Sequence, residues 1–333
     1  MAQVANTFET YDAVGNREEL ADKIWQITPE ETPGTSLIGR KSVDSIHPEW
    51  QTDTLGSVDT SNNVAEGNDW SYDAITPTTR VGNYCQISEK SLIVSNTQEV
   101  VKKAGRKSDL AREVAKKGTE LKIDMEAIIF SNQAASAGSG DGATNRTLAG
   151  FRAWCSTNDS VDSGGSSGSF SNGIQGAASN GTQRAFTKAI MDEVILAAYN
   201  AGGNPSVIMM SPYVKTVFSK LLDDADVVPL RNALKSGQAT LVAAADTYLS
   251  DFGTLTVVPN RQFARAGAGT ARNVYFIDPK MAKVGILRDI AVRKPAVTGD
   301  AEKRVLNVEY TLVMNNQAAH GVAADIYGLT ASS

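Results

Sequence analysis

Cysteine and histidine are scarce in this chain of 333 residues, which has only two of each. Cys85 and Cys155 form neither a disulfide framework nor a CxxC pair, so we expect reduced thiols of the kind found in cytosolic products. His47 and His320 are far apart in sequence and belong to no catalytic motif. A catalytic triad needs a nucleophile, a base and an orienting group within reach of one another. The composition therefore disfavours nucleophilic catalysis, and both histidines are expected in polar loops or turns.

An excess of basic residues and long apolar runs are also missing. The formal net charge is −5, which argues against the class of nucleic-acid-binding proteins that rely on surplus lysine and arginine. No run of 18 apolar residues predicts a membrane span, and residues 1–10 do not resemble a secretion signal. Hydrophobic residues make up 41% of the chain, which is enough for a sizeable core.

Ligand-binding motifs are incomplete wherever they are suggested. The glycine-rich segment Ala266 to Thr270 lacks the Gly-Lys-Ser/Thr ending of a phosphate-binding loop and precedes a strand, so a flexible hairpin is expected. The acidic run Leu222 to Asp226 lacks the glycine and terminal glutamate of a calcium loop, which favours a solvated turn. The sequence thus predicts no catalytic residue, no metal site and no cofactor.

A long charged helix is the most informative feature that is present. Between Asp109 and Asn132 the apolar positions recur every three or four residues, which predicts one helix about 36 Å long. These positions are Leu110, Val114, Gly118, Leu121, Met125 and Ile128. Glu113 and Lys117 on the polar face are spaced for an i, i+4 ion pair. A helix of this length is expected to form the axis of an elongated subunit.

Two signals mark the start of this helical region. Ser95 and Gln98 fit a capping box, which predicts a first helix from Thr97 to Ala104. Ser108 is then expected to cap the long helix.

The segments before the helix have little to bury on their own. Residues 1–45 read as an arm with a short helix from Arg17 to Ile27, ended by prolines, and an apolar anchor at Leu37 and Ile38. Residues 46–79 are polar and rich in turn residues, which predicts a projecting two-stranded loop. Its tryptophans, Trp50 and Trp70, are expected either against a neighbouring chain or packed back on their own domain.

The second half of the chain changes character. Residues 156–182 have linker composition, so a mobile surface loop is expected. A helix follows over 186–198, then strands at 207–210, 254–258 and 274–277, with a helix opening at Pro212. Strict alternation over 304–314 predicts a strand about 35 Å long with one buried face. A strand of that length beside the long helix would make a flat slab in an α+β fold.

At this point several segments resemble a known family. The carrying segments are 27–33 with 36–39, 47–53, 66–69, 80–94, 120–126, and the C-terminal stretch 307–312 with Ala318, Ala319 and 323–326. Together they resemble the major capsid proteins of tailed phages, with the Hong Kong 97-like fold, and among them the podophage-type subgroup. The resemblance covers nearly the whole chain, although 156–182 matches only by position.

The resemblance implies a division of the chain into five segments. They are an N-terminal arm (1–45), an extended loop (46–91), a peripheral domain with the spine helix (92–150), an axial domain (151–290) and long C-terminal strands that return through both domains (291–333). It also implies contacts between subunits. The candidate residues for these contacts are Trp25, Leu37, Ile38, Trp50, Trp70, Tyr72, Arg80, Glu113 and Lys117.

The function implied by the resemblance is self-assembly into hexamers and pentamers of an icosahedral head. Such a head encloses double-stranded DNA by non-specific contact, belongs to the virion and is assembled in the host cytoplasm. The lack of a long N-terminal scaffolding segment suggests a separate scaffolding protein and a portal as partners, and leaves a decoration protein open. No lysine occurs between Ile46 and Thr79, so covalent crosslinking through the loop is not expected.

Two other functions stay open on the sequence alone. One is the shell of a cellular nanocompartment, which shares the fold but encloses protein cargo. The other is a soluble α/β enzyme that uses residues 183–290, which would require a polar pocket at the strand ends. A tail fibre or tube protein is a weaker structural option, because the α/β half disfavours it.

Overall fold

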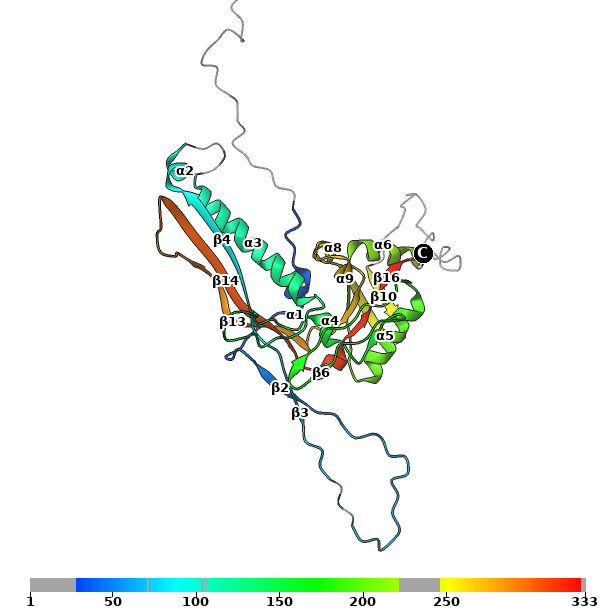
Figure 1. The fold of residues 1–333 in the computed structure, drawn as a ribbon. Helices are drawn as coiled ribbons and strands as arrows, with labels where there is room; N and C mark the ends of the chain where they lie inside the picture. The colour runs from blue at the N-terminus through cyan, green and yellow to red at the C-terminus, as the bar shows by residue number, and fades with distance from the viewer. Residues whose placement is uncertain are drawn as a thin grey trace, which may run out of the picture.

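The computed structural model describes residues 28–70, 72, 74–102, 105, 107–221 and 246–330. The predicted helix from Arg17 to Ile27, with Trp25, and the acidic run Leu222 to Asp226 lie outside the described residues. Figure 1 shows an elongated half built around one long helix, a compact half beside it, and a loop that projects below both.

The long helix of the elongated half is α3, Asp109–Ile129. As predicted, Ser108 caps it, since its hydroxyl accepts a hydrogen bond from the Ala111 amide at 3.1 Å. The helix ends three residues before the predicted Asn132, whose side chain instead bonds to Ala178 in the next segment. The apolar spacing thus correctly predicted a single long helix in this part of the sequence.

The predicted capping box at Ser95 is wrong. The helix α2, Asn96–Val100, begins there, but the Ser95 side chain makes no capping hydrogen bond. Gln98 donates instead to the Asp109 carboxylate at 2.9 Å, and Glu99 accepts from the Asp109 amide at 3.1 Å. Gln98, which was expected to cap α2, therefore stabilises the start of α3 together with Glu99.

A four-stranded sheet lies along α3. Its strand order is β1-β13-β14-β4, in which β14 runs antiparallel to both neighbours and β1 parallel to β13. The strands are β1 (Arg40–Ser42), β13 (Ala282–Arg293), β14 (Ala301–Met314) and β4 (Gln86–Ser95). The predicted long strand is thus confirmed, although it begins three residues earlier, and helix and strand lie side by side (Figure 1). The single buried face predicted for it is wrong for its second half, since every residue from Val308 to Met314 is buried.

The segment 80–94 has a strand-like pattern but does not form one continuous strand. Thr79–Gly82 forms β3, which pairs with β2 (Glu49–Thr52) at the base of the projecting loop, and β4 begins only at Gln86. Asn83, fully buried at the break, donates to the carbonyls of Ala149 and Leu312 and accepts from the Ala149 amide. Because these bonds replace strand pairing, the chain turns there from loop to sheet.

The compact half contains a six-stranded mixed sheet in the order β10-β11-β9-β12-β15-β5. Its strands are β10 (Thr247–Ser250), β11 (Gly253–Pro259), β9 (Val207–Met210), β12 (Val274–Ile277), β15 (Gly321–Ala323) and β5 (Asp159–Ser160). The main helices are α5 (Lys188–Asn200) and α6 (Pro212–Leu221), and β8 (Arg184–Ala185) pairs with β16 (Ile326–Gly328). The helices and strands predicted between residues 186 and 277 all occur.

The segment 156–182 is not the mobile linker that its composition suggested. It contributes β5 to the sheet and forms a small hairpin from β6 (Phe170–Ser171) and β7 (Ile174–Gln175). Buried Gln175 donates to the Ala153 carbonyl at 2.7 Å, and a Cβ on Gly168 would lie 2.0 Å from that same oxygen. Small residues here permit close backbone packing.

The glycine-rich segment Ala266 to Thr270 is also different from its prediction. It links two short helices, α8 (Arg261–Arg265) and α9 (Ala268–Ala271), and no hairpin forms. Gly267 has a φ of +106°, which favours glycine at the turn between them.

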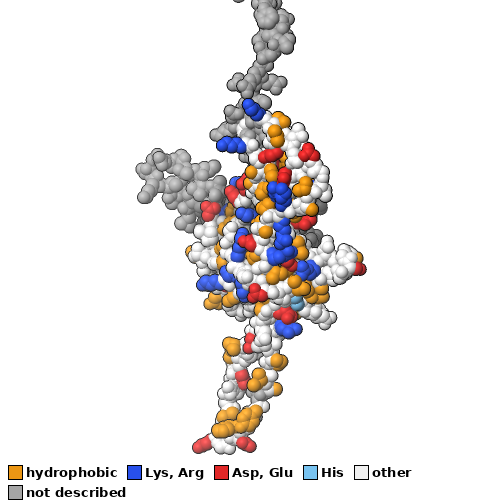
Figure 2. Space-filling model, turned by 90° about the vertical axis from the view of Figure 1, so that its left-hand side faces the viewer, with side chains coloured by type: hydrophobic (Ala, Val, Ile, Leu, Met, Phe, Trp, Pro, Cys, Tyr) orange, Lys and Arg blue, Asp and Glu red, His pale blue; other side chains and the backbone are white. Residues whose placement is uncertain are grey.

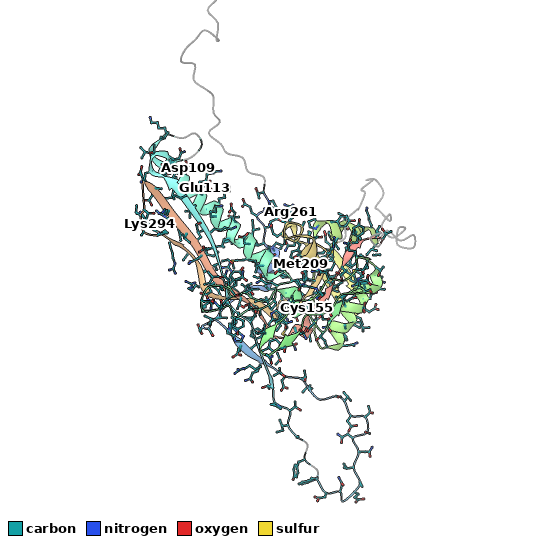
Figure 3. The ribbon with its side chains drawn as sticks, in the orientation of Figure 1. Asp109, Glu113, Cys155, Met209, Arg261 and Lys294 are labelled. Carbon is teal, nitrogen blue, oxygen red and sulfur yellow. The ribbon has the colours of Figure 1, made fainter. Side chains whose placement is uncertain are left out.

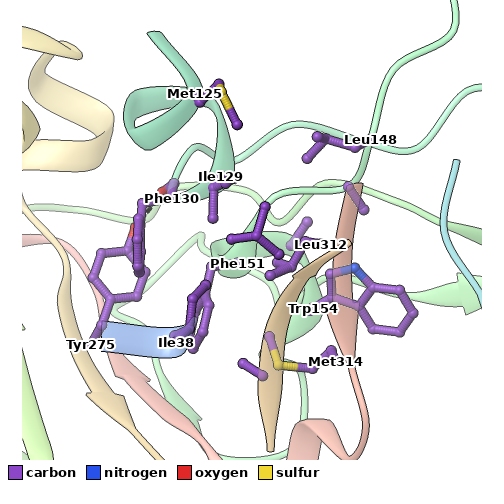
Figure 4. Close-up of a cluster of buried hydrophobic side chains, with 14 of the residues drawn as sticks. Ile38, Met125, Ile129, Phe130, Leu148, Phe151, Trp154, Tyr275, Leu312 and Met314 are labelled. Atoms are coloured by element: carbon purple, nitrogen blue, oxygen red, sulfur yellow. Dashed lines mark hydrogen bonds between the residues drawn. The ribbon is translucent and has the colours of Figure 1, made fainter. Parts of the chain in front are cut away.

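One hydrophobic core joins the two halves (Figure 4). It combines side chains of α3 with those of α1 (Pro33–Ile38), α4 (Phe151–Trp154), β12 and β14. The labelled members are Ile38, Met125, Ile129, Phe130, Leu148, Phe151, Trp154, Tyr275, Leu312 and Met314. A short 3-10 helix, Gln317–Ala319, then leads from β14 into β15. The halves consequently pack as one subunit, with the loop outside this core.

Candidate assembly surfaces

The projecting loop, residues 53–78, exposes apolar side chains that its own subunit does not cover. Trp70 is 82% exposed and Ile75 is 95% exposed. The other exposed large apolar residues are Leu55, Val58, Val64 and Tyr72. Figure 2 shows apolar side chains along the loop and acidic ones at its lower end. Contiguous exposed apolar surface on a protein indicates a contact with another molecule.

The loop also has charge of one sign. It contains Asp53, Asp59, Glu66, Asp69 and Asp73, and there is no lysine or arginine between Ile46 and Thr79. Hydrogen bonds from Ser61 hold the pKa of the Asp59 carboxyl below its usual range. The loop is therefore suited to a partner surface that offers both apolar area and basic side chains.

The base of the loop is anchored on the subunit. Trp50 packs against Trp154, with ring centroids 5.6 Å apart, while Arg80 pairs with Glu49 at 3.2 Å. His47 stacks on Tyr84, with ring centroids 4.1 Å apart. The two tryptophans thus take different positions: Trp50 packs on its own chain and Trp70 does not. Packing on its own domain is therefore confirmed for Trp50 alone, and the contact of Trp70 with a neighbouring chain stays a prediction.

The polar face of α3 pairs its charges differently from the prediction. Glu113 pairs with Arg112 at 3.1 Å, and Lys117 pairs with Glu120 at 2.7 Å. The expected Glu113 to Lys117 pair is therefore not formed. A groove of about 710 Å³ runs beside this face, lined mainly by Lys90, Arg112, Lys116, Glu120, Asp124 and Arg265. It combines basic and acidic side chains with the methylene groups that carry them.

The apolar anchor at Leu37 and Ile38 belongs to the subunit itself. Ile38 is fully buried in the core, and Leu37 is partly buried against it. Ile38 therefore has no exposed surface for a neighbouring subunit, in contrast to what the sequence suggested.

A family model described as the SU10 major capsid protein matches residues 3–327. The chain belongs to this family. A curated relative, the major capsid protein of Escherichia phage Phieco32, is 26% identical over 356 residues, and the match covers 98% of each chain. The chain is thus a major capsid protein of a tailed phage, a structural protein of the virion whose family forms shells.

Solved structures agree with this capsid protein in fold. A chain from Gordonia phage Cozz matches with a TM-score of 0.63 at 15% identity, covering 98% of this chain and 97% of that one. The capsid asymmetric unit of Cyanophage A-1(L) matches with a TM-score of 0.57 at 16% identity, covering 96% and 98%. These likenesses confirm the predicted α+β, Hong Kong 97-like fold.

The encapsulin SrpI of Synechococcus elongatus PCC 7942 shares the fold as well. It matches with a TM-score of 0.53 at 8% identity, covering 96% of this chain and 95% of that one. At such low identity the likeness shows the fold alone.

His320 of the capsid protein is buried in the core, not placed in a polar loop as expected. It is fully buried, its ring contacts that of Phe151 edge-on, and its Nδ1 accepts a hydrogen bond from the Asp278 amide at 3.2 Å. Burial lowers the pKa of His320 to about 4. This histidine is therefore a neutral packing residue at neutral pH.

Both cysteines are buried and unpaired, in agreement with the expected reduced thiols. Burial raises the pKa of Cys85 to about 11 and raises the pKa of Cys155 as well. A protonated, buried thiol is a poor nucleophile and a poor metal ligand. Across the described part of the chain, no group of three His, Cys, Asp or Glu residues could hold a metal ion, and no helix is long and apolar enough to cross a membrane.

The sequence reasoning missed four buried polar residues that organise this capsid subunit. Asn83 turns the chain at the loop base, Arg152 pairs with Asp159 at 3.2 Å, and Glu309 lies between two arginines. Glu126 accepts three hydrogen bonds, two from the arm segment and one from Asn260. None of the four left a local signal in the sequence, and the partners of Asn83, Glu126 and Glu309 are distant along the chain.

Proposed function

We propose that this major capsid protein assembles into hexamers and pentamers of an icosahedral head that encloses double-stranded DNA, and that it catalyses no reaction. The observation that carries this proposal is the projecting loop, whose apolar side chains lie outside the core of their own subunit. Stable protein interfaces bury on the order of 1,200 Å² or more. A loop reaching a neighbouring subunit would supply much of that area.

The parts of the subunit take the roles expected for the fold. We assign residues 1–45 to the N-terminal arm, 46–91 to the extended loop and 92–150 to a peripheral domain with α3 as its spine. Residues 151–290 would form the axial domain near capsomer centres, and 291–333 the long returning strands. The continuous core between the two halves supports a subunit that moves as one rigid body during assembly.

The contacts between subunits are proposed to involve surface residues of three regions. Trp70 and Tyr72 would bind a neighbour directly, and Arg80 would hold the loop base through Glu49. Glu113 and Lys117 lie on the polar face of α3, which offers a second contact surface. Trp25 in the arm remains a further candidate, whereas Trp50 and Leu37 would support the loop and the arm from inside the subunit.

Other partners follow from the same proposal. A separate scaffolding protein and a portal would direct assembly in the host cytoplasm, with a decoration protein as an optional addition. Packaged DNA would make only non-specific contacts with the shell. A chain with a net charge of −5 has no surplus of lysine and arginine that would bind phosphate groups tightly. Covalent crosslinking through a loop lysine is not proposed, because no lysine occurs between Ile46 and Thr79.

A nanocompartment shell is the second candidate, favoured by the likeness to the SrpI encapsulin. Family membership and the phage relative favour the phage head, because both cover almost the whole chain. The family match over residues 3–327 includes residues 183–290, the region that a soluble α/β enzyme would use. We therefore do not propose an enzyme.

Electron microscopy of the expressed chain, with and without its scaffolding protein, tests the proposal. We expect closed shells, and we expect shells isolated from infected cells to hold DNA. Shells filled with one protein cargo would instead support the nanocompartment. A compact monomer under every assembly condition would contradict both.

A further inference from the structure

The arm segment, residues 28–38, approaches the subunit with little hydrophobic contact at its start. No side chain from Thr28 to Glu31 is buried. The first buried residue is Gly34, which has no side chain, and the first buried apolar side chain is Ile38. The course of residues 28–35 therefore depends on polar contacts.

Glu126 of α3 makes the first of these contacts. Its carboxylate is fully buried and accepts from the Gly34 amide through Oε1 and from the Thr35 amide through Oε2, both at 2.7 Å. These amides lie in the first turn of α1 and have no acceptor within that helix. Thr32, at the capping position, makes no side-chain cap. Glu126 thus satisfies donors that would otherwise be unpaired.

Asn260 and Gln262, at the start of α8, make the second contact. The Asn260 side-chain amide donates to Glu126 Oε1 at 2.7 Å, and its oxygen accepts from the Gln262 amide at 2.9 Å. The Gln262 side chain then donates to the carbonyls of Pro29 at 3.0 Å and Glu31 at 3.1 Å. Asn260, Gln262 and Glu126 are all fully buried. Figure 3 labels the intervening residue, Arg261, where the compact half approaches the arm segment.

Among the described residues, the hydrogen-bond donors to the Glu126 carboxyl are all uncharged. None of the ion pairs found among the described residues includes Glu126. A buried carboxylate without a cation needs all of its hydrogen bonds. Each of the three donors is therefore required, and they come from the arm segment and from the compact half.

Gly34 shows how closely the arm segment is fitted. A Cβ at this position would lie 2.2 Å from the Phe130 ring and 2.6 Å from Glu126 Oε1. Real side-chain carbons do not approach so closely, so any larger residue would lift the arm segment off α3.

We infer that Glu126 is a positioning residue which, with Asn260 and Gln262, fixes the course of the arm segment across the junction of the two halves, and that assembly requires this course. The second part rests on the proposed function. Because hydrogen bonds rather than apolar burial set the course, a change of one atom redirects the arm segment and leaves the core in place.

Hydrogen exchange of the full-length chain tests the first part. Glu126→Gln keeps the shape of the side chain but replaces one carboxylate oxygen by an amide NH2 group, which is a donor. The new side chain therefore cannot accept from Gly34, Thr35 and Asn260 together. We expect the Gly34 and Thr35 amides to exchange about tenfold faster or more, the loss expected when a buried donor lacks its acceptor. The β14 amides should stay protected. Glu120→Gln on the same helix, which pairs only with Lys117, is the matched control.

Two further variants separate this role from a general loss of stability. Gly34→Ala should expose the same amides through steric conflict alone. Adding Asn260→Asp to Glu126→Gln reverses the donor and the acceptor of that hydrogen bond and keeps the charge and the α8 cap. This double variant should recover part of the protection lost in Glu126→Gln.

Shell assembly by the same proteins tests the second part. We expect Glu126→Gln and Gly34→Ala to assemble less than the parent chain, and the double variant to recover in part. Unchanged protection at Gly34 and Thr35 in Glu126→Gln would overturn the positioning role. Exposed amides with normal assembly would overturn the link to assembly. If the parent chain itself forms no shells, the proposed function fails, and exchange alone decides the positioning role.

Discussion

Glu309 is a buried carboxylate held between two arginines that come from different segments. Its Oε1 is 2.6 Å from Arg146 Nη2, and its Oε2 is 2.7 Å from Arg288 Nε. The side chain of Glu309 is only 5% exposed. The arrangement ties the loop before α4 to β13 at an irregularity in its pairing with β14.

We predict that Glu309→Gln lowers the free energy of unfolding of the unassembled subunit by about 2 kcal/mol, because the buried side chain can then no longer accept a charge-assisted hydrogen bond from both arginines. Urea unfolding followed by tryptophan fluorescence measures the change. Glu302→Gln is the control, since Glu302 on β14 also pairs with two cations, Lys294 and Arg304, but its side chain is 30% exposed, so screening should leave the unfolding midpoint nearly unchanged. Equal effects of the two changes would contradict the prediction.

His320 gives the subunit a pH dependence of known sign. Burial lowers its pKa to about 4 in the folded protein, against about 6.5 in an unfolded chain. Between these values only the unfolded chain takes up the proton, so the free energy of unfolding decreases as the pH falls from about 6.5 to about 4. The contribution approaches about 3 kcal/mol.

Substitution of His320 by glutamine should therefore flatten the stability curve in that range. Unfolding in urea at a series of pH values, compared between the two proteins, provides the measurement. A stability difference that stays constant from pH 7 to pH 4 would show that His320 does not titrate as described.

At the scale of the element, Gly118 lies in the middle of α3, where glycine is unfavourable for a helix. A Cβ at Gly118 would meet Leu306 at 3.7 Å, an ordinary van der Waals distance. We predict that Gly118→Ala raises the free energy of unfolding by about 0.5–1 kcal/mol. The control is Gly285→Ala in β13, whose Cβ would lie 2.9 Å from side-chain atoms of Thr311 and Val43 and should destabilise. Thermal unfolding of both variants distinguishes the two outcomes.

The elements also show where sequence patterns stop being informative. The helix α3 and the strand β14 were predictable, because each has a long apolar period that only one structure satisfies. The break at Asn83 was not, since the pattern continues through it and the partners of Asn83 are distant in sequence. The same reason explains the failed capping box at Ser95, whose Gln98 turns to α3 instead.

At the scale of the whole molecule, the projecting loop should matter for assembly and not for the subunit. Trp70→Ala is expected to change the free energy of unfolding by less than about 0.5 kcal/mol, because the side chain is 82% exposed. Buried aromatic residues dominate many interfaces, so we expect assembly to need about tenfold more subunit. Light scattering during assembly measures this requirement.

Trp50→Ala is the matched control for the loop. It removes packing against Trp154 and should lower subunit stability. If Trp70→Ala lowers stability as much as Trp50→Ala, or leaves assembly unchanged, the proposed role of the loop is wrong.

By itself the sequence determined the long helix, the long strand, the polar projecting loop and the order of elements in the compact half. These depend on local periodicity and turn chemistry, which a single chain displays in full. The position of the loop tryptophans was left open by the sequence, and only the structure separated Trp50, which packs on its own subunit, from exposed Trp70.

Only the tertiary structure decided which polar residues are buried and what they join. Glu126 and Glu309 look like ordinary surface acids in the sequence, and residues 156–182 look like a linker. The positions of these acids depend on donors that are distant in the sequence. Glu126 accepts from Gly34, which is 92 residues away, and Glu309 accepts from Arg146, which is 163 residues away. Such long-range pairing leaves no local pattern, because the burial of a charge is favourable only once all of its partners have been brought together.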